Sequence, residues 1–156
     1  MTTSPSLIIS RFQPSDQQEA KALILAGLAE HWGILDLSLN PDLNDIASTY
    51  AGADFLVARI AGRIVGTGAL VPCGAGSAEI VRMSVAADQR RCGIGRRIVS
   101  GLVALARERG YQRVVLETTA SWVEVIQFYL RCGFSITHYQ GEDVYFEKIL
   151  AHPQMT

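Results

Sequence analysis

The sequence lacks an excess of charge of either sign. Its 156 residues include 14 Lys and Arg against 15 Asp and Glu, so the formal net charge is −1, and charged residues make up only 19% of the chain. Proteins that bind nucleic acid or an anionic membrane through their overall field carry a large positive charge, so the composition argues against both partners. Hydrophobic residues reach 49%, which is too many for a disordered chain.

Long apolar runs and paired cysteines are also missing. No stretch comes near the roughly 20 apolar residues of a membrane helix, and the first residues lack the basic region and apolar run of a secretion signal. The three cysteines, Cys73, Cys92 and Cys132, are odd in number and far apart, which argues against a disulfide framework and against a zinc site. The sequence therefore predicts a cytoplasmic protein without a bound metal.

The chain length and the apolar pattern predict one α/β (α+β) domain over residues 7–150, with flexible tails at 1–6 and 151–156. The predicted strands cover residues 7–12, 55–60, 64–71, 78–85, 113–118, 134–139 and 144–149. The predicted helices lie within residues 15–32, 40–50, 94–106 and 121–133. Because a helix connects the fourth strand to the fifth, these two strands should pair in parallel, inside a mixed, mostly antiparallel sheet flanked by helices.

The small net charge hides a cationic block in the middle of the chain. Residues 82–113 carry eight arginines and two acids, whereas the segments before and after them are acidic. Within this block, residues 89–97 read Gln-Arg-Arg-Cys-Gly-Ile-Gly-Arg-Arg at the start of a predicted helix. Glycines there let backbone N–H groups approach an anion, the helix dipole adds about half a positive charge, and arginines bind phosphate oxygens. Since the dipole disfavours cations at this end, the arginines favour a bound polyanion over a turn that glycines merely shape.

Two nucleotide-binding motifs fit this segment poorly. A dinucleotide loop needs G-x-G-x-x-G directly after a strand, but Ile98 stands at the third glycine, and residues 86–92 separate the loop from the strand. A phosphate loop ending in G-K-[ST] is absent. Glu117 could imitate the acid that binds a ribose, so a dinucleotide-binding module stays an alternative.

Two motifs resemble the GNAT superfamily of acetyl-CoA-dependent N-acetyltransferases. Residues 90–95 match its signature [QR]-x-x-G-x-[GA] at every specified position, and residues 126–134 match its later pattern aliphatic-x-Phe-Tyr-x-x-x-Gly-Phe. The motifs stand in the family's order, with one helix and one strand between them. The resemblance is strong over residues 78–134. It departs from the family at Trp122, where many members have asparagine, and at Ala87, where proline is frequent.

The resemblance implies the GNAT-like acyl-CoA N-acyltransferase fold and an enzyme that transfers the acetyl group of acetyl-CoA to a primary amine by direct attack. Backbone groups of residues 83–85 would pair with the pantetheine arm like an added strand, and one of their N–H groups would polarise the thioester carbonyl. The glycine turn would hold the pyrophosphate. The residues expected to bind acetyl-CoA are Met83, Ser84, Val85, Arg90, Arg91, Cys92, Gly93, Ile94, Gly95 and Arg96.

Tyr129 and Glu79 are the expected catalytic residues. The resemblance implies that Tyr129 is the general acid that protonates the departing thiolate. The alternative is that Tyr129 packs in the core, as we expect for Phe128 beside it. Glu79 resembles the strand glutamate that serves as general base in some members. The alternative for Glu79 is a surface charge paired with Arg82 or Arg59.

Two other acids and one thiol are weaker candidates. Glu117 and Glu124 could also act as the base, but Glu124 is expected to form a capping box with Ser121. Cys92 beside the cationic turn could be a nucleophile, although no histidine stands in a recognisable partner motif. A passive cysteine is the interpretation we favour.

The acceptor is not defined by the sequence. The acids around the first two predicted helices, namely Glu30, Asp36, Asp42 and Asp45, could attract a cationic amine, but we favour solvated charges. A small molecule, a peptide and a protein all stay open as acceptors, and so does a homodimer. The alternative from another functional class is a CoA-binding sensor or interaction module without transfer activity.

Overall fold

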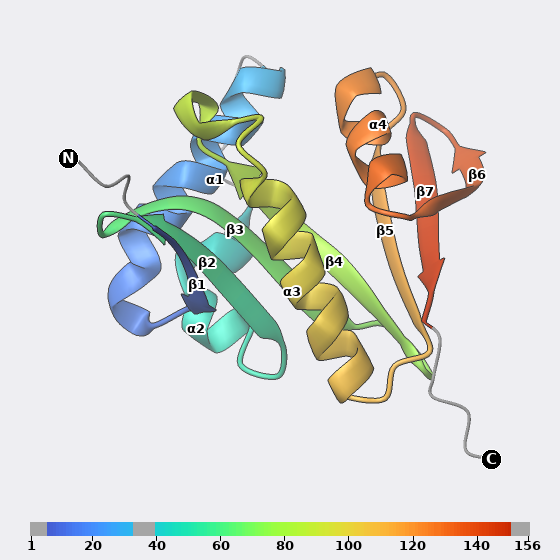
Figure 1. Ribbon diagram of the computed structural model, residues 1–156, viewed down its shortest axis with the longest axis horizontal. Helices are drawn as coiled ribbons and strands as arrows, with labels where there is room; N and C mark the ends of the chain where they lie inside the picture. The colour runs from blue at the N-terminus through green and yellow to red at the C-terminus, as the bar shows by residue number, and fades with distance from the viewer. Residues whose placement is uncertain (1–5, 33–39, 151–156) are drawn as a thin grey trace.

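Runs of β-branched and apolar residues form one seven-stranded sheet in the computed structural model, which describes residues 6–32 and 40–150 (Figure 1). The strands are β1 (Leu7–Arg11), β2 (Asp54–Ile60), β3 (Arg63–Pro72), β4 (Ser77–Val85), β5 (Arg113–Thr119), β6 (Ser135–Gln140) and β7 (Asp143–Ile149). Their order is β1-β2-β3-β4-β5-β7-β6. β4 and β5 pair in parallel and all other neighbours pair antiparallel, which confirms the predicted mixed sheet. The predicted tails, apart from Ser6, lie outside the described residues.

A two-residue turn joins β2 to β3, which correspond to the strands predicted over residues 55–60 and 64–71. Ile60 pairs with Arg63, and the two residues between them have φ angles of +52° at Ala61 and +83° at Gly62. Positive φ at both central residues is the geometry whose twist matches that of the flanking strands. The turn therefore helps to set the register of β2 and β3, and β3 in turn pairs with the central strand β4.

Three longer helices flank the sheet at the predicted places. They are α1 (Gln17–Trp32), α3 (Ile94–Glu108) and α4 (Val123–Arg131), and two single turns, η1 (Pro14–Asp16) and η4 (Ala87–Gln89), precede α1 and α3. Apolar residues three or four apart, such as Ile94, Ile98 and Leu102, form the buried face of α3. Within the described ranges, no helix combines the length and the apolar character that crossing a membrane requires.

The helix predicted over residues 40–50 is broken in two. The structure has η3 (Pro41–Asn44) and then α2 (Ile46–Thr49). Asp45 between them adopts a φ of −150°, outside the helical region, and its carboxylate accepts a hydrogen bond from the Ser48 N–H at 3.2 Å. An aspartate before a short helix favours this cap over a helical backbone, because its side chain satisfies a free N–H group.

The two faces of the sheet are covered unequally. α3 and α4 pack on one face over a cluster that includes Leu56, Leu70, Leu116 and Phe146, from both ends of the sheet. On the other face α1, η3 and α2 cover a second cluster, and its buried sheet residues, among them Val57, come from β2 and β3. Among the described residues, no helix covers this second face over β5, β7 and β6. The helical layer on this face therefore ends beside β4.

Candidate active site

β4 and β5 separate soon after they begin. Within the described residues they pair at three positions, where Ser77, Ala78 and Glu79 lie opposite residues 113–115. Beyond these pairs the two strands diverge, and Figure 1 shows the gap widening toward the C-terminal end of each strand. The edge of β4 that faces β5 therefore has free backbone N–H and C=O groups from residue 80 onward, which is the kind of edge that an extended ligand can join.

A β-bulge bends β4 at the edge of this gap. Thr67 lies opposite Ser84 and Ala69 opposite Val81, so β4 contains one extra residue, and Arg82 has a φ of +55°. The hydroxyl of Thr67 donates a hydrogen bond to the Arg82 carbonyl at 2.8 Å. A bulge turns the following residues relative to the ladder. The expected pantetheine-binding residues 83–85 directly follow it, and all three are half-buried.

The glycine turn leads into the N-terminus of α3 as predicted. Gly93 has a φ of +81°, and no described side chain caps the helix behind it. A Cβ at Gly95 would lie 3.1 Å from Cζ of Phe128, a tighter contact than most, so glycine suits the close approach of α3 to α4 here. Gly93 thus shapes the turn, and anion binding at this turn stays a prediction. The uncapped first turn of α3 also leaves N–H groups free to bind an anion.

The arginines of this turn have different environments. Arg90 makes two hydrogen bonds to the Glu30 carboxylate, at 2.5 and 2.8 Å, and one to the Val85 carbonyl. Glu30 is exposed, as expected of a solvated helix charge, and its ion pair also joins the end of α1 to the turn. Arg91 and Arg96 are exposed, and Arg96 forms no ion pair within the part of the chain that the structure describes.

Two weaker candidates take no part in a catalytic arrangement. The Cys92 thiol is exposed and lies 3.6 Å from the Arg90 carbonyl, and no described histidine contacts it. The predicted capping box of Glu124 is wrong, since α4 begins after Trp122 and no described side chain caps it. Glu124 is exposed, and its carboxylate lies 3.9 Å from the Arg91 guanidinium. A carboxylate here lies beside the turn expected to bind phosphate.

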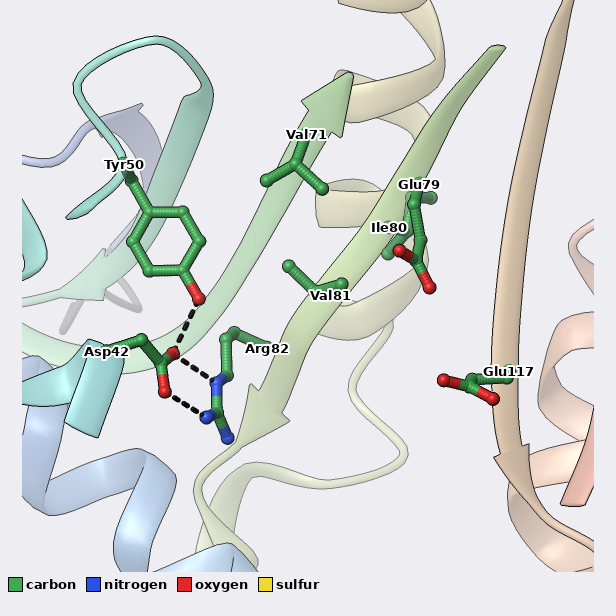
Figure 2. A pocket seen from close by; sticks show the side chains of 8 residues that line it. All are labelled: Asp42, Tyr50, Val71, Glu79, Ile80, Val81, Arg82 and Glu117. Atoms are coloured by element: carbon green, nitrogen blue, oxygen red, sulfur yellow. Dashed lines mark hydrogen bonds and ion pairs between the residues drawn. The ribbon is translucent and has the colours of Figure 1, made fainter. Parts of the chain in front are cut away.

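A pocket of about 460 Å³ opens beside β4, on the face that α1 and α2 cover. It is lined by Asp42, Tyr50, Val71, Glu79, Ile80, Val81, Arg82 and Glu117. Figure 2 shows Glu79 and Glu117 pointing toward each other across the gap between β4 and β5. The pocket thus brings together a predicted general base and its weaker alternative. No set of three described His, Cys, Asp or Glu residues could hold a metal ion here or elsewhere.

Glu79 is half-buried, and no described residue neutralises it. Burial raises the pKa of its carboxyl group, and the nearby Glu117 carboxylate raises it further. Neither arginine expected as a partner is available, because Arg82 binds Asp42 and Arg59 binds Asp16. The structure therefore excludes both ion pairs proposed for Glu79 and leaves its carboxylate able to accept a proton.

Glu117 differs from Glu79 in having a polar neighbour. It lies opposite Tyr145 of β7, and a hydrogen bond between the two side chains raises the pKa of Tyr145. Glu117 is also more exposed than Glu79. Its position in the pocket suits a group that influences Glu79 through its charge.

On the other side of the pocket, Arg82, Asp42 and Tyr50 form a hydrogen-bonded group (Figure 2). Arg82 donates to both Asp42 oxygens, at 2.9 and 2.6 Å, and the Tyr50 hydroxyl donates to one of them at 2.6 Å. Burial alone would raise the pKa of Asp42, but these hydrogen bonds outweigh it and lower the pKa below its ordinary value. The same environment raises the pKa of Tyr50 to about 12.

The sequence did not reveal this group. Asp42 was expected to be a solvated charge, and that expectation is wrong. Asp45, from the same set of acids, serves as the α2 cap, and Asp36 lies outside the described residues. The signal that could have found the pair is weak, because the two partners are 40 residues apart in the chain.

Tyr129 lies in the core, with 6% of its surface exposed. Its ring packs against the rings of Phe128, Phe134 and Phe146, with centroids 5.0, 6.0 and 5.8 Å away. Burial of the residue raises the pKa of its hydroxyl. This hydroxyl has no hydrogen bond to a described residue, and since no buried side-chain oxygen of the described residues lacks a partner, solvent must reach it. Phe128, expected in the core, is only half-buried against the glycine turn. The structure thus bears out the core packing of Tyr129 and leaves its role as an acid a prediction.

Comparison with known proteins identifies the family. Residues 20–134 match the Acetyltransferase (GNAT) family. Among curated proteins, the chain is 34% identical over 122 residues to a probable N-acetyltransferase, camello, of Xenopus tropicalis. It is 34% identical over 107 residues to N-acetyltransferase 8B of Rattus norvegicus. These matches cover 72% and 64% of this chain, and the chain spans about half the length of these relatives, 56% and 48% respectively.

Solved structures show the same fold. A GNAT-family acetyltransferase of Staphylococcus aureus superposes with a TM-score of 0.86 at 21% identity, covering 94% of this chain and 100% of that one. The PaiA N-acetyltransferase of Thermoplasma acidophilum, solved in complex with coenzyme A, superposes with a TM-score of 0.81 at 18% identity. That match covers 93% of this chain and 99% of the other. With the family match over most of its length, the chain belongs to the GNAT family of acetyltransferases.

Proposed function

We propose that the protein transfers the acetyl group of acetyl-CoA to a primary amine. The observation that carries this proposal is the free edge of β4 beyond its three pairs with β5. This edge lies near the uncapped N-terminus of α3 and leads to the pocket of Glu79. Family membership and the coenzyme A complex of the Thermoplasma relative support the choice of cofactor.

The free edge and the helix start fit the two ends of the cofactor. Backbone groups of residues 83–85 would pair with the pantetheine amides, as a strand pairs with a sheet edge. The first turn of α3 would bind the pyrophosphate, with Arg91 and Arg96 adding charge-assisted hydrogen bonds. Arg90, which Glu30 holds, would contribute by keeping the turn in place.

The carboxylate of Glu79 would then accept a proton from the acceptor ammonium in the pocket. The free amine forms a C–N bond to the acetyl carbon, the C–S bond to CoA breaks, and the nitrogen gives up its second proton, which balances the proton that the sulfur takes up. The Tyr129 hydroxyl would give its proton to the departing sulfur, since a phenol with a pKa at or above its ordinary 10 holds this proton at neutral pH. A backbone N–H at the bulge would stabilise the developing oxyanion, a contribution of about 3 kcal/mol in comparable sites.

The first test replaces the base. Glu79→Gln should lower kcat by about 10²- to 10⁴-fold, because a general base contributes on this scale. The KM for acetyl-CoA should stay unchanged. Release of the CoA thiol with a panel of amines measures both, and Glu108→Gln, an exposed glutamate in the last turn of α3, is the matched control. An unchanged kcat would remove Glu79 from the mechanism.

The second test replaces the phosphate-binding arginines. Arg91→Ala together with Arg96→Ala should raise the KM for acetyl-CoA strongly, since two charge-assisted contacts are lost. Arg107→Ala is the matched control, because Arg107 is exposed at the opposite end of the same helix. Equal KM values for the two variants would contradict the assignment of the phosphate site.

The packing of the Tyr129 ring in the core favours a second candidate function, a CoA-binding module without transfer activity. A tyrosine that serves only the core would leave the cofactor site intact without supplying an acid. Tyr129→Phe distinguishes the candidates, since it should lower kcat in an enzyme that uses this hydroxyl. Thermal stabilisation by CoA without turnover of any amine would favour the binding module, and stabilisation by NAD instead of CoA would favour a dinucleotide site.

A further inference from the structure

Arg82 is held at both its backbone and its side chain. Its carbonyl accepts the hydrogen bond from the Thr67 hydroxyl, and Thr67 is fully buried. Its guanidinium binds Asp42 through two nitrogens and the Asn40 side chain at 3.0 Å. Two separate elements, β3 and η3, therefore fix a single residue of β4.

The backbone of Arg82 needs such support. A φ of +55° is uncommon for a residue with a side chain, and conformations of this kind cost about 1–3 kcal/mol each. They persist where the surroundings determine them. Here Gly68 lies across from the extra residue of the bulge, and a Cβ on it would lie 2.6 Å from the Met83 sulfur. The bulge is thus fixed by contacts from the neighbouring strand as well as by Asp42.

The position of Arg82 links two parts of the site. Its side chain and those of Asp42 and Tyr50 line the amine pocket, and its backbone immediately precedes residues 83–85. An N–H group that stabilises an oxyanion must be aimed with a tolerance well below about 1 Å, since a misplacement of that size can cost 10²-fold in rate. The direction of these N–H groups depends on the bulge.

We propose that Arg82 is a positioning residue for acetyl transfer. Held by Asp42, Tyr50 and Thr67, it keeps the bulge of β4 in the conformation that directs the N–H groups of residues 83–85 into the cleft. This proposal rests on the proposed function. It adds a link between the wall of the amine pocket and the backbone that polarises the thioester.

The experiment weakens the support of Arg82 from each side. Asp42→Asn keeps the size of the side chain but removes its charge, and Thr67→Val removes the hydroxyl that binds the Arg82 carbonyl. Each should lower kcat by roughly 10- to 100-fold, while the KM for acetyl-CoA stays within about threefold. Thr67→Ser keeps the hydroxyl that Thr67→Val lacks, so it should keep most of the wild-type kcat. Asp45→Asn, on the same segment but outside the pocket, should behave like the wild type.

The outcomes separate the two proposals. If the wild type turns over no amine, the proposed function fails before the variants are compared. If the wild type is active and both Asp42→Asn and Thr67→Val keep kcat within about twofold, the positioning role of Arg82 is overturned. Unfolding free energies are measured beside the kinetics, and Tyr50→Phe, which removes a single hydrogen bond, replaces Asp42→Asn if that variant does not fold. The positioning role predicts a lower kcat in Tyr50→Phe, and an unchanged kcat overturns it.

Discussion

Two carboxylates near the start of β2 and of β4, Asp54 and Glu79, are both withdrawn from water, and their pKa values are shifted in opposite directions. Asp54 begins β2 and accepts hydrogen bonds from Arg109 at 2.6 Å and from Arg11 at 2.7 Å. Burial alone would raise its pKa, but the two guanidinium groups outweigh this and lower it. Glu79 has burial and the Glu117 carboxylate acting in the same direction.

The difference lies in the sign of the neighbour. A carboxylate between arginines stabilises the fold and has lost its basicity, which suits the outer corner where β1, β2 and the end of α3 meet. A carboxylate beside another carboxylate is costly to the fold and more basic, which suits proton transfer. The lowered pKa of Asp54 and the raised pKa of Glu79 therefore distinguish an acid that stabilises the fold from the base proposed for catalysis.

Removing the paired carboxylate should have the largest effect on stability. Asp54→Asn should lower the free energy of unfolding at pH 7 by about 2 kcal/mol, because both arginines lose a charged partner but remain partly solvated. Urea unfolding measures the loss. Since the folded-state pKa of Asp54 is below the ordinary 3.8, its contribution is present above pH 3.8 and is lost as the pH falls through the lower value.

The free energies of unfolding of wild type and Asp54→Asn, plotted against pH, should therefore converge at acid pH. Glu142→Gln, in the exposed turn between β6 and β7, is the control and should be neutral. A gap that stayed constant down to pH 2 would show that Asp54 stabilises through packing and not through charge.

Removing the unpaired carboxylate should have a smaller effect of opposite sign. Glu79→Gln should raise the free energy of unfolding at pH 7 by about 0.5 kcal/mol, a modest gain because the site is partly solvated. The raised pKa means that the wild type loses stability as the pH rises from the ordinary 4.5 through the folded-state value. Thermal unfolding across this range measures it. A less stable variant at pH 7 would contradict the view that this charge is costly.

The smallest effect should come from removing the charge of Glu117, the neighbour that raises the pKa of Glu79, and it should appear in the pH dependence of kcat/KM. Glu117→Gln removes a like charge, so the acidic limb of the kcat/KM profile should move to lower pH. Tyr145→Phe, which removes the hydroxyl but keeps the Glu117 charge, serves as the control. If the acidic limb of the kcat/KM profile did not move, burial alone would account for the raised pKa of Glu79.

Much of the fold could be predicted because it depends on local patterns. The strands and the longer helices follow from apolar residues at spacings of two or of three to four, and the parallel pair follows from the helix between the fourth and fifth strands. The helix over residues 40–50 was predicted wrongly, since Asp45 satisfies a backbone N–H group instead of continuing the helix.

The candidate site was only partly predictable, because its contacts join distant segments. Glu79 and the turn at residues 90–95 stand in recognisable motifs. The approach of Glu117 depends on where β4 and β5 stop pairing, and the Asp42–Arg82 pair depends on the bulge and on how η3 packs. The half-buried position of Phe128 reflects the close approach of α3 at Gly95, which no helical pattern expresses.

The short junction between β4 and β5 also has a consequence for folding. β2, β3 and β4 follow one another through short turns, as do β6 and β7, and such neighbours can pair early at little cost in chain entropy. The β4–β5 junction closes the long connection through α3 and has three residue pairs to compensate for it. We therefore expect it to form late. The proposed cleft lies directly beyond this junction, so catalytic competence would appear only when the whole domain has assembled.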